Sequence, residues 1–321
     1  MMKKIFFLGV LGCMALSSQA TILRVSNVEG NTAPYAKLAD AYANAAAGDT
    51  IVLDGSPNNY GDLVVDSVPV TIMGHGYFLL NNGITQSNNS DACVGVITVQ
   101  QPGTVIRNLT FSDVSVMTSN VVVTQCNGGS VHHGGVKDGG YYSDIAHTNI
   151  VIHQNILGRI RGRNHHSGEF LSQCQITNNI LTGTNGFMNP VICNIKNSLI
   201  QYNTEISYNK NGNDVFVDDI LGCEVNDNIH LSGGLPQNGE SNNSIGEHNV
   251  NHSIGHQWKL DSGVKEAIDS LTNLGYGAFA GDDPYVISGV PAGPVIESID
   301  MPVSVEKGKT LDVVVKIKIQ K

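Results

Sequence analysis

Histidine and arginine side chains gather in residues 158–170, GRIRGRNHHSGEF, which contain three of the five arginines of the chain. A second histidine pair lies just before them, in residues 127–147. Histidine can act as a general base or a metal ligand, and arginine pairs with carboxylates and sulfates. We predict that the two segments form one ligand-binding patch. Its residues are His132, His133, Asp138, His147, Arg161, Arg163, His165, His166 and Glu169.

Two other interpretations of this patch stay open. The charged side chains can be solvated decoration of long loops, since loops lie at the surface. A metal or catalytic centre is the third interpretation, although adjacent histidines lack the spacing of a known metal motif. We therefore assign no metal and no catalytic residue from the pattern.

Repeats in the sequence indicate the backbone that must position these residues. The segments VIRNLTF, IHQNIL, ITNNIL, IKNSLI and VNDNIH begin at residues 105, 152, 176, 195 and 225, with spacings of 47, 24, 19 and 30 residues. A period of about 24 residues is typical of a solenoid whose coils each bury one face against the next. The sequence predicts an all-β fold, a single-stranded right-handed parallel β-helix with an N-terminal capping helix and a C-terminal strand extension.

Asparagines and cysteines recur at fixed places in these repeats. The polar bend position falls at Asn108, Asn155, Asn179, Ser198 and Asn228. An asparagine there tolerates left-handed backbone and bonds its equivalent one coil away. Cys174, Cys193 and Cys223 each stand two residues before an aligned apolar residue, so we expect them to point inward as stacked, reduced thiols. A zinc site is disfavoured, because no fourth ligand comes from the same core.

The same alignment places a file of polar side chains on one outer face. The file consists of Arg107, His153, Thr177, Lys196 and Asn226. Arg107, His153 and Lys196 would hold an anionic sugar chain, and a polysaccharide lyase would need one such residue as a base. Calcium is implied only in that case, and no acidic cluster suited to it lies at these positions. A plain solvated sheet face is the competing interpretation.

The N-terminal residues have the features of a secretory signal. Lys3 and Lys4 precede an apolar run, residues 5–16, and small residues lead to Ala20, so we expect cleavage after Ala20. A lipoprotein signal at Cys13 is the less favoured alternative. Removing both lysines changes the formal charge from −10 to −12. Such an acidic chain is a poor partner for nucleic acid, and no later apolar run is long enough to span a membrane.

The predicted organisation has four parts. Residues 1–20 are the signal peptide, 21–60 an N-terminal cap with the first strands, 61–260 the coils, and 261–321 a C-terminal cap with terminal strands. An alanine-rich helix at residues 36–47 is expected to cover the first coil, because the open end of a solenoid needs a cap. We expect a monomer, secreted or held in the cell envelope.

The chain resembles the pectin-lyase-like right-handed β-helix proteins, and among them the secreted β-helix proteins of Bacteroidota. The resemblance rests on AAAGDTIVLDG at residues 45–55, VTIMGHG at 70–76, the repeated asparagine bends, and GYGAFAGDDPYVISGVPAGPVIESIDMP at 275–302. It covers nearly all of the mature chain. It implies the fold but no particular reaction, since one fold carries many functions.

Gly74-His75-Gly76 also matches a signature of polygalacturonases, which hydrolyse with paired acids such as Asp218 and Asp219. The order is wrong, because in that family the signature follows the acids, and no arginine occurs here after residue 163. We therefore expect His75 to be a turn residue. Two functions stay open: a non-catalytic protein that binds polysaccharide, and a uronate lyase. A purely structural protein is the third.

Overall fold

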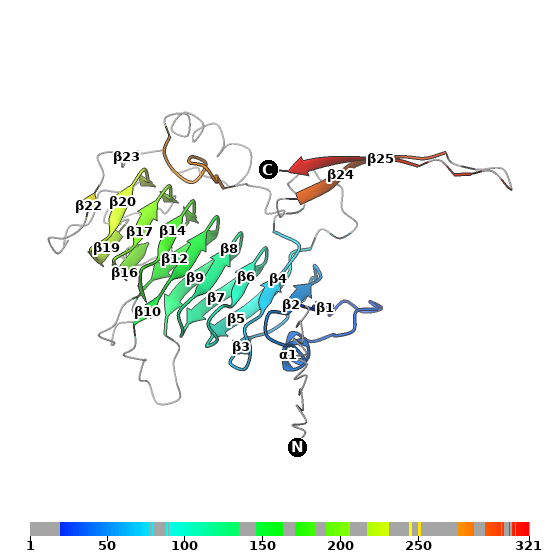
Figure 1. Ribbon diagram of the computed structural model, residues 1–321, viewed down its shortest axis with the longest axis horizontal. Coiled ribbons are helices and arrows are strands. Elements are labelled where there is room, and N and C mark those ends of the chain that lie inside the picture. The colour runs from blue at the N-terminus through cyan, green and yellow to red at the C-terminus, as the bar shows by residue number, and fades with distance from the viewer. Residues whose placement is uncertain are drawn as a thin grey trace, which may run out of the picture.

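The structure is a computed structural model that describes residues 20–77, 79, 88, 90–134, 146–162, 171–183, 191–205, 217–230, 244–245, 250–251, 275–285, 293–302, 304, 308, 310–311 and 313–320. These residues form an all-β, solenoid-like stack of parallel strands (Figure 1). Each coil contributes a strand to one sheet and then a strand to a second sheet. The predicted signal peptide lies outside the described residues, apart from Ala20.

The first sheet, sheet A, contains ten described strands, all parallel to their neighbours. Most are three or four residues long, which is short because each strand must turn into the second sheet within one coil. In spatial order they are β1 (Ile22–Val25), β2 (Thr50–Leu53), β4 (Thr71–Met73), β6 (Val105–Arg107), β8 (Val121–Thr124), β11 (Ile150–His153), β14 (Gln175–Thr177), β17 (Leu199–Gln201), β20 (Glu224–Asn226) and β22 (Ser244–Ile245).

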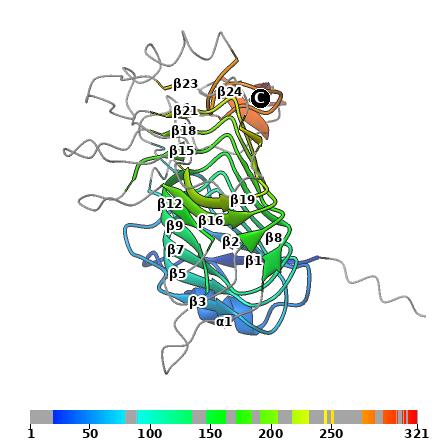
Figure 2. The same cartoon turned by 90° about the vertical axis from the view of Figure 1, so that its left-hand side faces the viewer.

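The second sheet, sheet B, lies across the core from sheet A (Figure 2). Its main path is β3 (Leu63–Val65), β5 (Cys93–Val99), β7 (Thr110–Val116), β9 (Asn127–His133), β12 (Ile156–Arg161), β15 (Ile180–Leu181), β18 (Thr204–Glu205), β21 (Ile229–His230) and β23 (Val250–Asn251). A branch beside β12 contains β10 (His147–Thr148), β13 (Leu171–Ser172), β16 (Ile192–Lys196) and β19 (Val217–Leu221).

Left-handed residues flank the sheet A strands on both sides. The residue just after these strands has a positive φ at Asn108, Gln125, Gln154, Asn178, Tyr202 and Asp227. The turn before them has positive φ at Asn120, Asn149, Gln173, Asn197 and Gly222. Asparagine and glycine adopt this backbone at low cost, which explains why they recur with the coil period.

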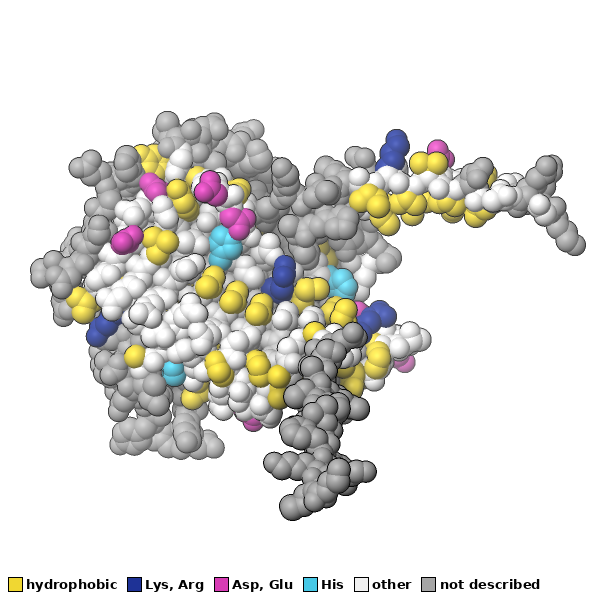
Figure 3. All heavy atoms as spheres, viewed as in Figure 1, with side chains coloured by type: hydrophobic (Ala, Val, Ile, Leu, Met, Phe, Trp, Pro, Cys, Tyr) yellow, Lys and Arg dark blue, Asp and Glu magenta, His cyan; other side chains and the backbone are white. Residues whose placement is uncertain are grey.

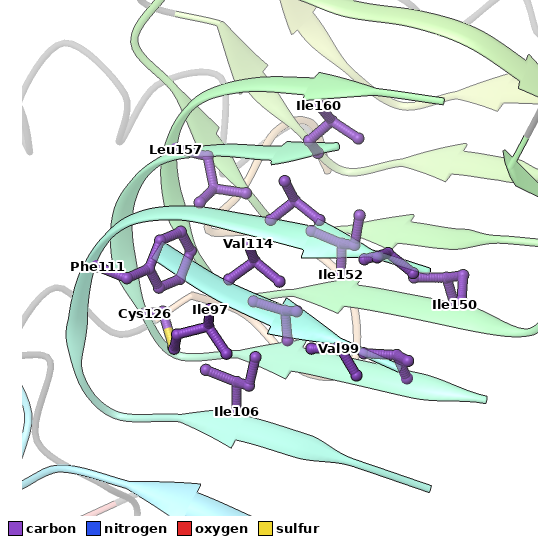
Figure 4. Close-up of a cluster of buried hydrophobic side chains, with 14 of the residues drawn as sticks. Ile97, Val99, Ile106, Phe111, Val114, Cys126, Ile150, Ile152, Leu157 and Ile160 are labelled. Atoms are coloured by element: carbon purple, nitrogen blue, oxygen red, sulfur yellow. The ribbon is translucent and has the colours of Figure 1, made fainter. Parts of the chain in front are cut away.

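The core lies between the two sheets. Side chains alternate along each strand, so Ile106, Val114 and Ile152 point inward and are fully buried. Figure 4 shows such side chains from successive coils packed against one another. Each buried Ile, Val or Leu contributes about 1.5–3 kcal/mol of burial free energy. The stacking of like residues therefore stabilises each coil through its neighbours.

A ladder of buried asparagines follows the sheet A turn. The Nδ2 atoms of Asn155, Asn179 and Asn203 each donate to the side-chain oxygen of the next asparagine at 3.0 Å, and the ladder ends at Asn228. The same oxygens accept backbone N–H groups, since Asn179 Oδ1, for example, accepts the N–H of Asn155 at 3.0 Å. All four asparagines are fully buried. The ladder thus satisfies polar groups inside the bend.

Two residues expected in the asparagine ladder, Asn108 and Ser198, lie outside it. One residue that the sequence analysis did not include, Asn203, belongs to it. Arg107 is in register with Thr124, so Asn108 occupies the left-handed position one residue before the ladder. Ser198 lies in the turn before β17, where its Oγ accepts the backbone N–H of Cys174 at 2.8 Å. Asn203 takes the ladder position instead. Because asparagine suits both turns, the sequence pattern did not separate them.

The three cysteines are buried, but they do not form one column. Cys174 and Cys223 lie in the turn before a sheet A strand, with Ser198 between them, because Gln175, Leu199 and Glu224 are in register. Cys193 lies on β16 in sheet B, paired with Arg161. The expected stack of Cys193 with the other two is therefore wrong. None of these three cysteines forms a disulfide.

The first coil is capped by a helix shorter than expected. Helix α1 (Leu38–Ala43) buries Leu38, Ala41 and Tyr42 against the first strands. It ends at Asn44, and Asp49 then fixes the following turn by accepting the backbone N–H groups of Ala46 at 2.8 Å and Thr21 at 2.7 Å. These bonds lower the pKa of Asp49. The shape of this opening is thus set by hydrogen bonds from backbone N–H groups to Asp49.

Residues 275–285 lie along the corner where sheet A turns into sheet B. The backbone N–H of Gly277 donates to the carbonyl of Asp227, Asn178 Nδ2 donates to the carbonyls of Ala278 and Ala280, and Gln154 Nε2 donates to Asp283. Successive coils therefore bind this segment in reverse chain order. The segment therefore joins several successive coils along their side.

The last described strands form a separate antiparallel ribbon, β24 (Gly293–Asp300) and β25 (Val314–Gln320), which projects away from the coils (Figure 1). The pairs Ile296–Ile317 and Ile299–Val315 form an apolar side (Figure 3). These four side chains are 44–62% exposed. No helix in the described part of the chain is long and apolar enough to cross a membrane.

Candidate functional site

An outward column on sheet B carries the residues best suited to bind a ligand. Arg161 on β12 is in register with His132 on β9 and with Cys193 on β16. His132 and Arg161 alternate with the core residues Val131 and Ile160, so both point away from the core. Neighbouring strands are about 4.8 Å apart. The histidine and the guanidinium therefore share one surface, which we call the sheet B patch.

Two more cations extend the sheet B patch. Arg159 lies two residues before Arg161 on the same face and is 8% exposed. Lys196 lies on β16, in register with Ser172 and outward of the core residue Ile195. The expected place of Lys196 in the sheet A file is wrong, since Gln201 stands there, in register with Thr177. Lys196 was misplaced for the same reason as Ser198, because asparagine suits the turn before a sheet A strand as well as the turn after it.

The electrostatics of the patch follow from burial and like charge. Burial lowers the pKa of Arg159, and the neighbouring Arg161 lowers it further. Burial also lowers the pKa of His132, while Asp113 opposes the shift. The Nδ1 atom of His132 donates to the carbonyl of Gly134 at 3.1 Å. The imidazole is therefore neutral near pH 7, with its proton on Nδ1 and a lone pair on Nε2.

His133 and His147 do not belong to this surface. Consecutive strand residues point to opposite faces, and His133 is in register with the core residue Val116. His147 is in register with the core residue Leu171. The two rings stack inside the molecule with centroids 4.8 Å apart. The expectation that both lie in the surface patch is therefore wrong.

The ends of the two long segments lie side by side. Where they leave sheet B, His132 is in register with Arg161, and where they return, His147 is in register with Leu171. The remaining residues of the predicted patch lie outside the described residues. They are Asp138, Arg163, His165, His166 and Glu169.

The outer face of sheet A carries the other predicted file. Arg107, Thr124, His153 and Thr177 are in register, and Gln201 and Asn226 continue the column. His153 has both ring nitrogens engaged, Nδ1 with Thr177 Oγ1 at 2.8 Å and Nε2 with Asp283 Oδ2 at 3.0 Å. In this arrangement His153 holds residues 275–285 in place, and no lone pair is left for a base.

The polygalacturonase-like signature has a structural role. His75 Nδ1 donates to the carbonyl of Leu53 at 2.9 Å. A Cβ at Gly74 would lie 2.5 Å from the carbonyl oxygen of Asn108, so only glycine fits. Asp218 lies on β19, in register with Cys193, far along the chain and the stack from His75. The motif therefore does not assemble with these acids.

Within the described ranges, no three His, Cys, Asp or Glu side chains gather in a way that would hold a metal ion. Comparison with known proteins adds no relative: no family model, curated protein or solved structure matches the chain.

Proposed function

We propose that this chain is a right-handed parallel β-helix protein of the pectin-lyase-like kind, secreted or held in the cell envelope, that binds acidic polysaccharide on the sheet B patch. Secretion is supported by the signal-like residues 1–20. The handedness is supported by the general rule that parallel crossover connections are right-handed. Polysaccharide is an extended ligand, and a regular outer face of stacked strands offers an extended surface.

One observation carries the choice of an acidic ligand. Arg159, Arg161 and Lys196 lie on the outer side of two hydrogen-bonded strands, β12 and β16, in a chain whose formal net charge is −10. Cations that gather on an acidic protein create a local field of opposite sign. Such a field attracts carboxylates or sulfates, and salt screens it.

Direct binding measurements test this proposal. We expect the full chain to bind a uronate-containing polysaccharide at low salt and to bind it more weakly as salt rises. The double variant Arg161→Gln/Lys196→Gln should lose at least about tenfold in affinity, because each charged hydrogen bond is worth about 1.5–3 kcal/mol. A neutral polysaccharide should bind no better than background.

A matched control separates the patch from net charge. The variant Arg107→Gln/Lys316→Gln removes the same charge from the outer face of sheet A and from β25, and it should leave binding nearly unchanged. Equal losses in both double variants would show that only net charge matters. Binding that persists in Arg161→Gln/Lys196→Gln would place the ligand elsewhere.

A uronate lyase is the second candidate, favoured by the neutral His132 beside Arg161. In such a reaction His132 Nε2 would accept the proton next to the uronate carboxylate, and Arg161 would neutralise that carboxylate. The glycosidic C–O bond would break as a C=C bond forms, and the departing oxygen would take its proton from the imidazolium of His132. The low pKa of His132 keeps it in the basic form.

Absorbance of an unsaturated product tests the lyase. Under this second proposal, the wild-type chain produces the absorbance, His132→Gln abolishes it, and His153→Gln retains it because both ring nitrogens of His153 are engaged. Binding without any new absorbance would leave the non-catalytic function and reject the lyase.

A further inference from the structure

His133 and His147 form a buried pair where the chain leaves β9 and enters β10. His133 is fully buried and His147 is 6% exposed. Their ring planes are tilted by 38° with centroids 4.8 Å apart. The places in register with them on the neighbouring coils hold Val116 and Leu171, which are aliphatic. Two imidazoles therefore fill core positions that neighbouring coils fill with apolar side chains.

The surroundings of the pair disfavour a positive charge. Val116 and Leu171, the described residues in register with the two rings, carry no charge, and the His147 Nε2 atom is buried with no hydrogen-bond partner among the described residues. The charged and titratable side chains nearby on β7, β9, β12 and β16 alternate with core residues and face outward. They are Asp113, His132, Arg159, Arg161, Cys193 and Lys196.

We infer that the His133–His147 pair is a pH-sensitive contact that joins the end of β9 to β10 while both rings are neutral and opens when either ring is protonated. This inference goes beyond the proposed glycan binding and does not depend on it. His132 directly precedes His133 on β9, so opening of the contact changes the support of the sheet B patch.

The direction of the pH effect follows from the two states of the chain. Burial first, and His133 second, lower the pKa of His147 to about 4. In the unfolded chain a histidine pKa is about 6.5, so the unfolded or opened state takes up a proton first as the pH falls. The stabilisation is therefore complete above about pH 6.5 and is lost as the pH falls through the range down to about 4.

Hydrogen exchange in the full chain reports this opening locally. The backbone N–H of Gly134 donates to the carbonyl of Val116 at 3.0 Å, and that of Thr148 donates to Ser119 Oγ at 3.0 Å. After correction for the intrinsic rate, protection at these two amides should fall at least about tenfold between pH 7 and pH 5. The amide of Thr71, bonded to Asp49 far from the pair, should keep its protection.

The variant His133→Leu/His147→Leu removes the titrating groups and should keep Gly134 and Thr148 protected at pH 5. If that variant does not fold, the ring proton shifts of wild-type His147 still decide the matter. Titration of His147 near 6.5 would overturn the inference. So would an equal loss of protection at Thr71, or a loss at Gly134 that persists in the double variant.

Discussion

The hydroxyl groups of Tyr77 and Tyr285 lie 2.6 Å apart although the residues are separated by 208 positions in the chain. Both side chains are buried, and they pack with Ile156, Ile180 and Ala278 in a cluster outside the main core. Burial is the main reason that the pKa of each phenol is raised. This contact fastens residues 275–285 to an early coil.

A double-mutant cycle measures that contact. Tyr285→Phe should lower the free energy of unfolding by about 1–3 kcal/mol, because a buried hydroxyl of Tyr77 loses its bond to Tyr285. Tyr77→Phe/Tyr285→Phe should recover part of that loss, since removing both polar partners can be nearly neutral. Strictly additive losses would show that the two hydroxyls do not interact.

The asparagine ladder makes a second prediction. Asn179→Ala removes bonds to Asn155, Asn203 and Ile152, and it should cost at least about 1–3 kcal/mol by urea unfolding. Asn149 is the control, because it also bonds an asparagine of a neighbouring coil, Asn120 of the preceding coil at 2.7 Å, but at the exposed surface. Asn149→Gly keeps the left-handed backbone and should change stability by less than about 0.5 kcal/mol. Similar costs at both sites would contradict a special role for the ladder.

Thiol labelling tests the corrected placement of the cysteines. Cys174 and Cys223 are buried, and burial raises the pKa of the Cys174 thiol to about 12. Both should label slowly in the native protein and quickly after unfolding, whereas the half-buried Cys93 should label sooner. With Ser198 between them, Cys174 and Cys223 are roughly two strand spacings, about 9.6 Å, apart, beyond disulfide reach. A native disulfide joining them would reject this register.

The parallel stack was predictable because asparagines and buried aliphatic residues recur in the sequence with the period of one coil. The register near β16 was not, because asparagine suits the left-handed turns on both sides of the sheet A strands, as at Asn197 before β17 and Asn178 after β14. The pair Asn197-Ser198 lies before β17, but its sequence resembles the turn that follows a sheet A strand, so the alignment placed it there. The same error in the alignment placed Lys196 on the outer face of sheet A and stacked Cys193 with Cys174 and Cys223, although both residues lie on β16 of sheet B.

The sheet B patch was only partly predictable. The arginine-rich segment indicated it, and strand alternation would have separated His132 outside from His133 inside. The branch in sheet B pairs Cys193 of β16 with Arg161 of β12 and places Lys196 three residues further along β16, and it depends on pairing between strands far apart in sequence. The contacts of residues 275–285 with the coils also join residues far apart in the sequence. Local sequence patterns therefore do not predict these contacts.

The most direct test of the proposed function is hydrogen exchange with and without an acidic polysaccharide. We predict added protection on β9, β12 and β16, at residues around His132, Arg161 and Lys196, with β11, β14 and β17 of sheet A unchanged. Added protection confined to sheet A, around His153 and Thr177, would contradict the assignment of the binding surface to sheet B.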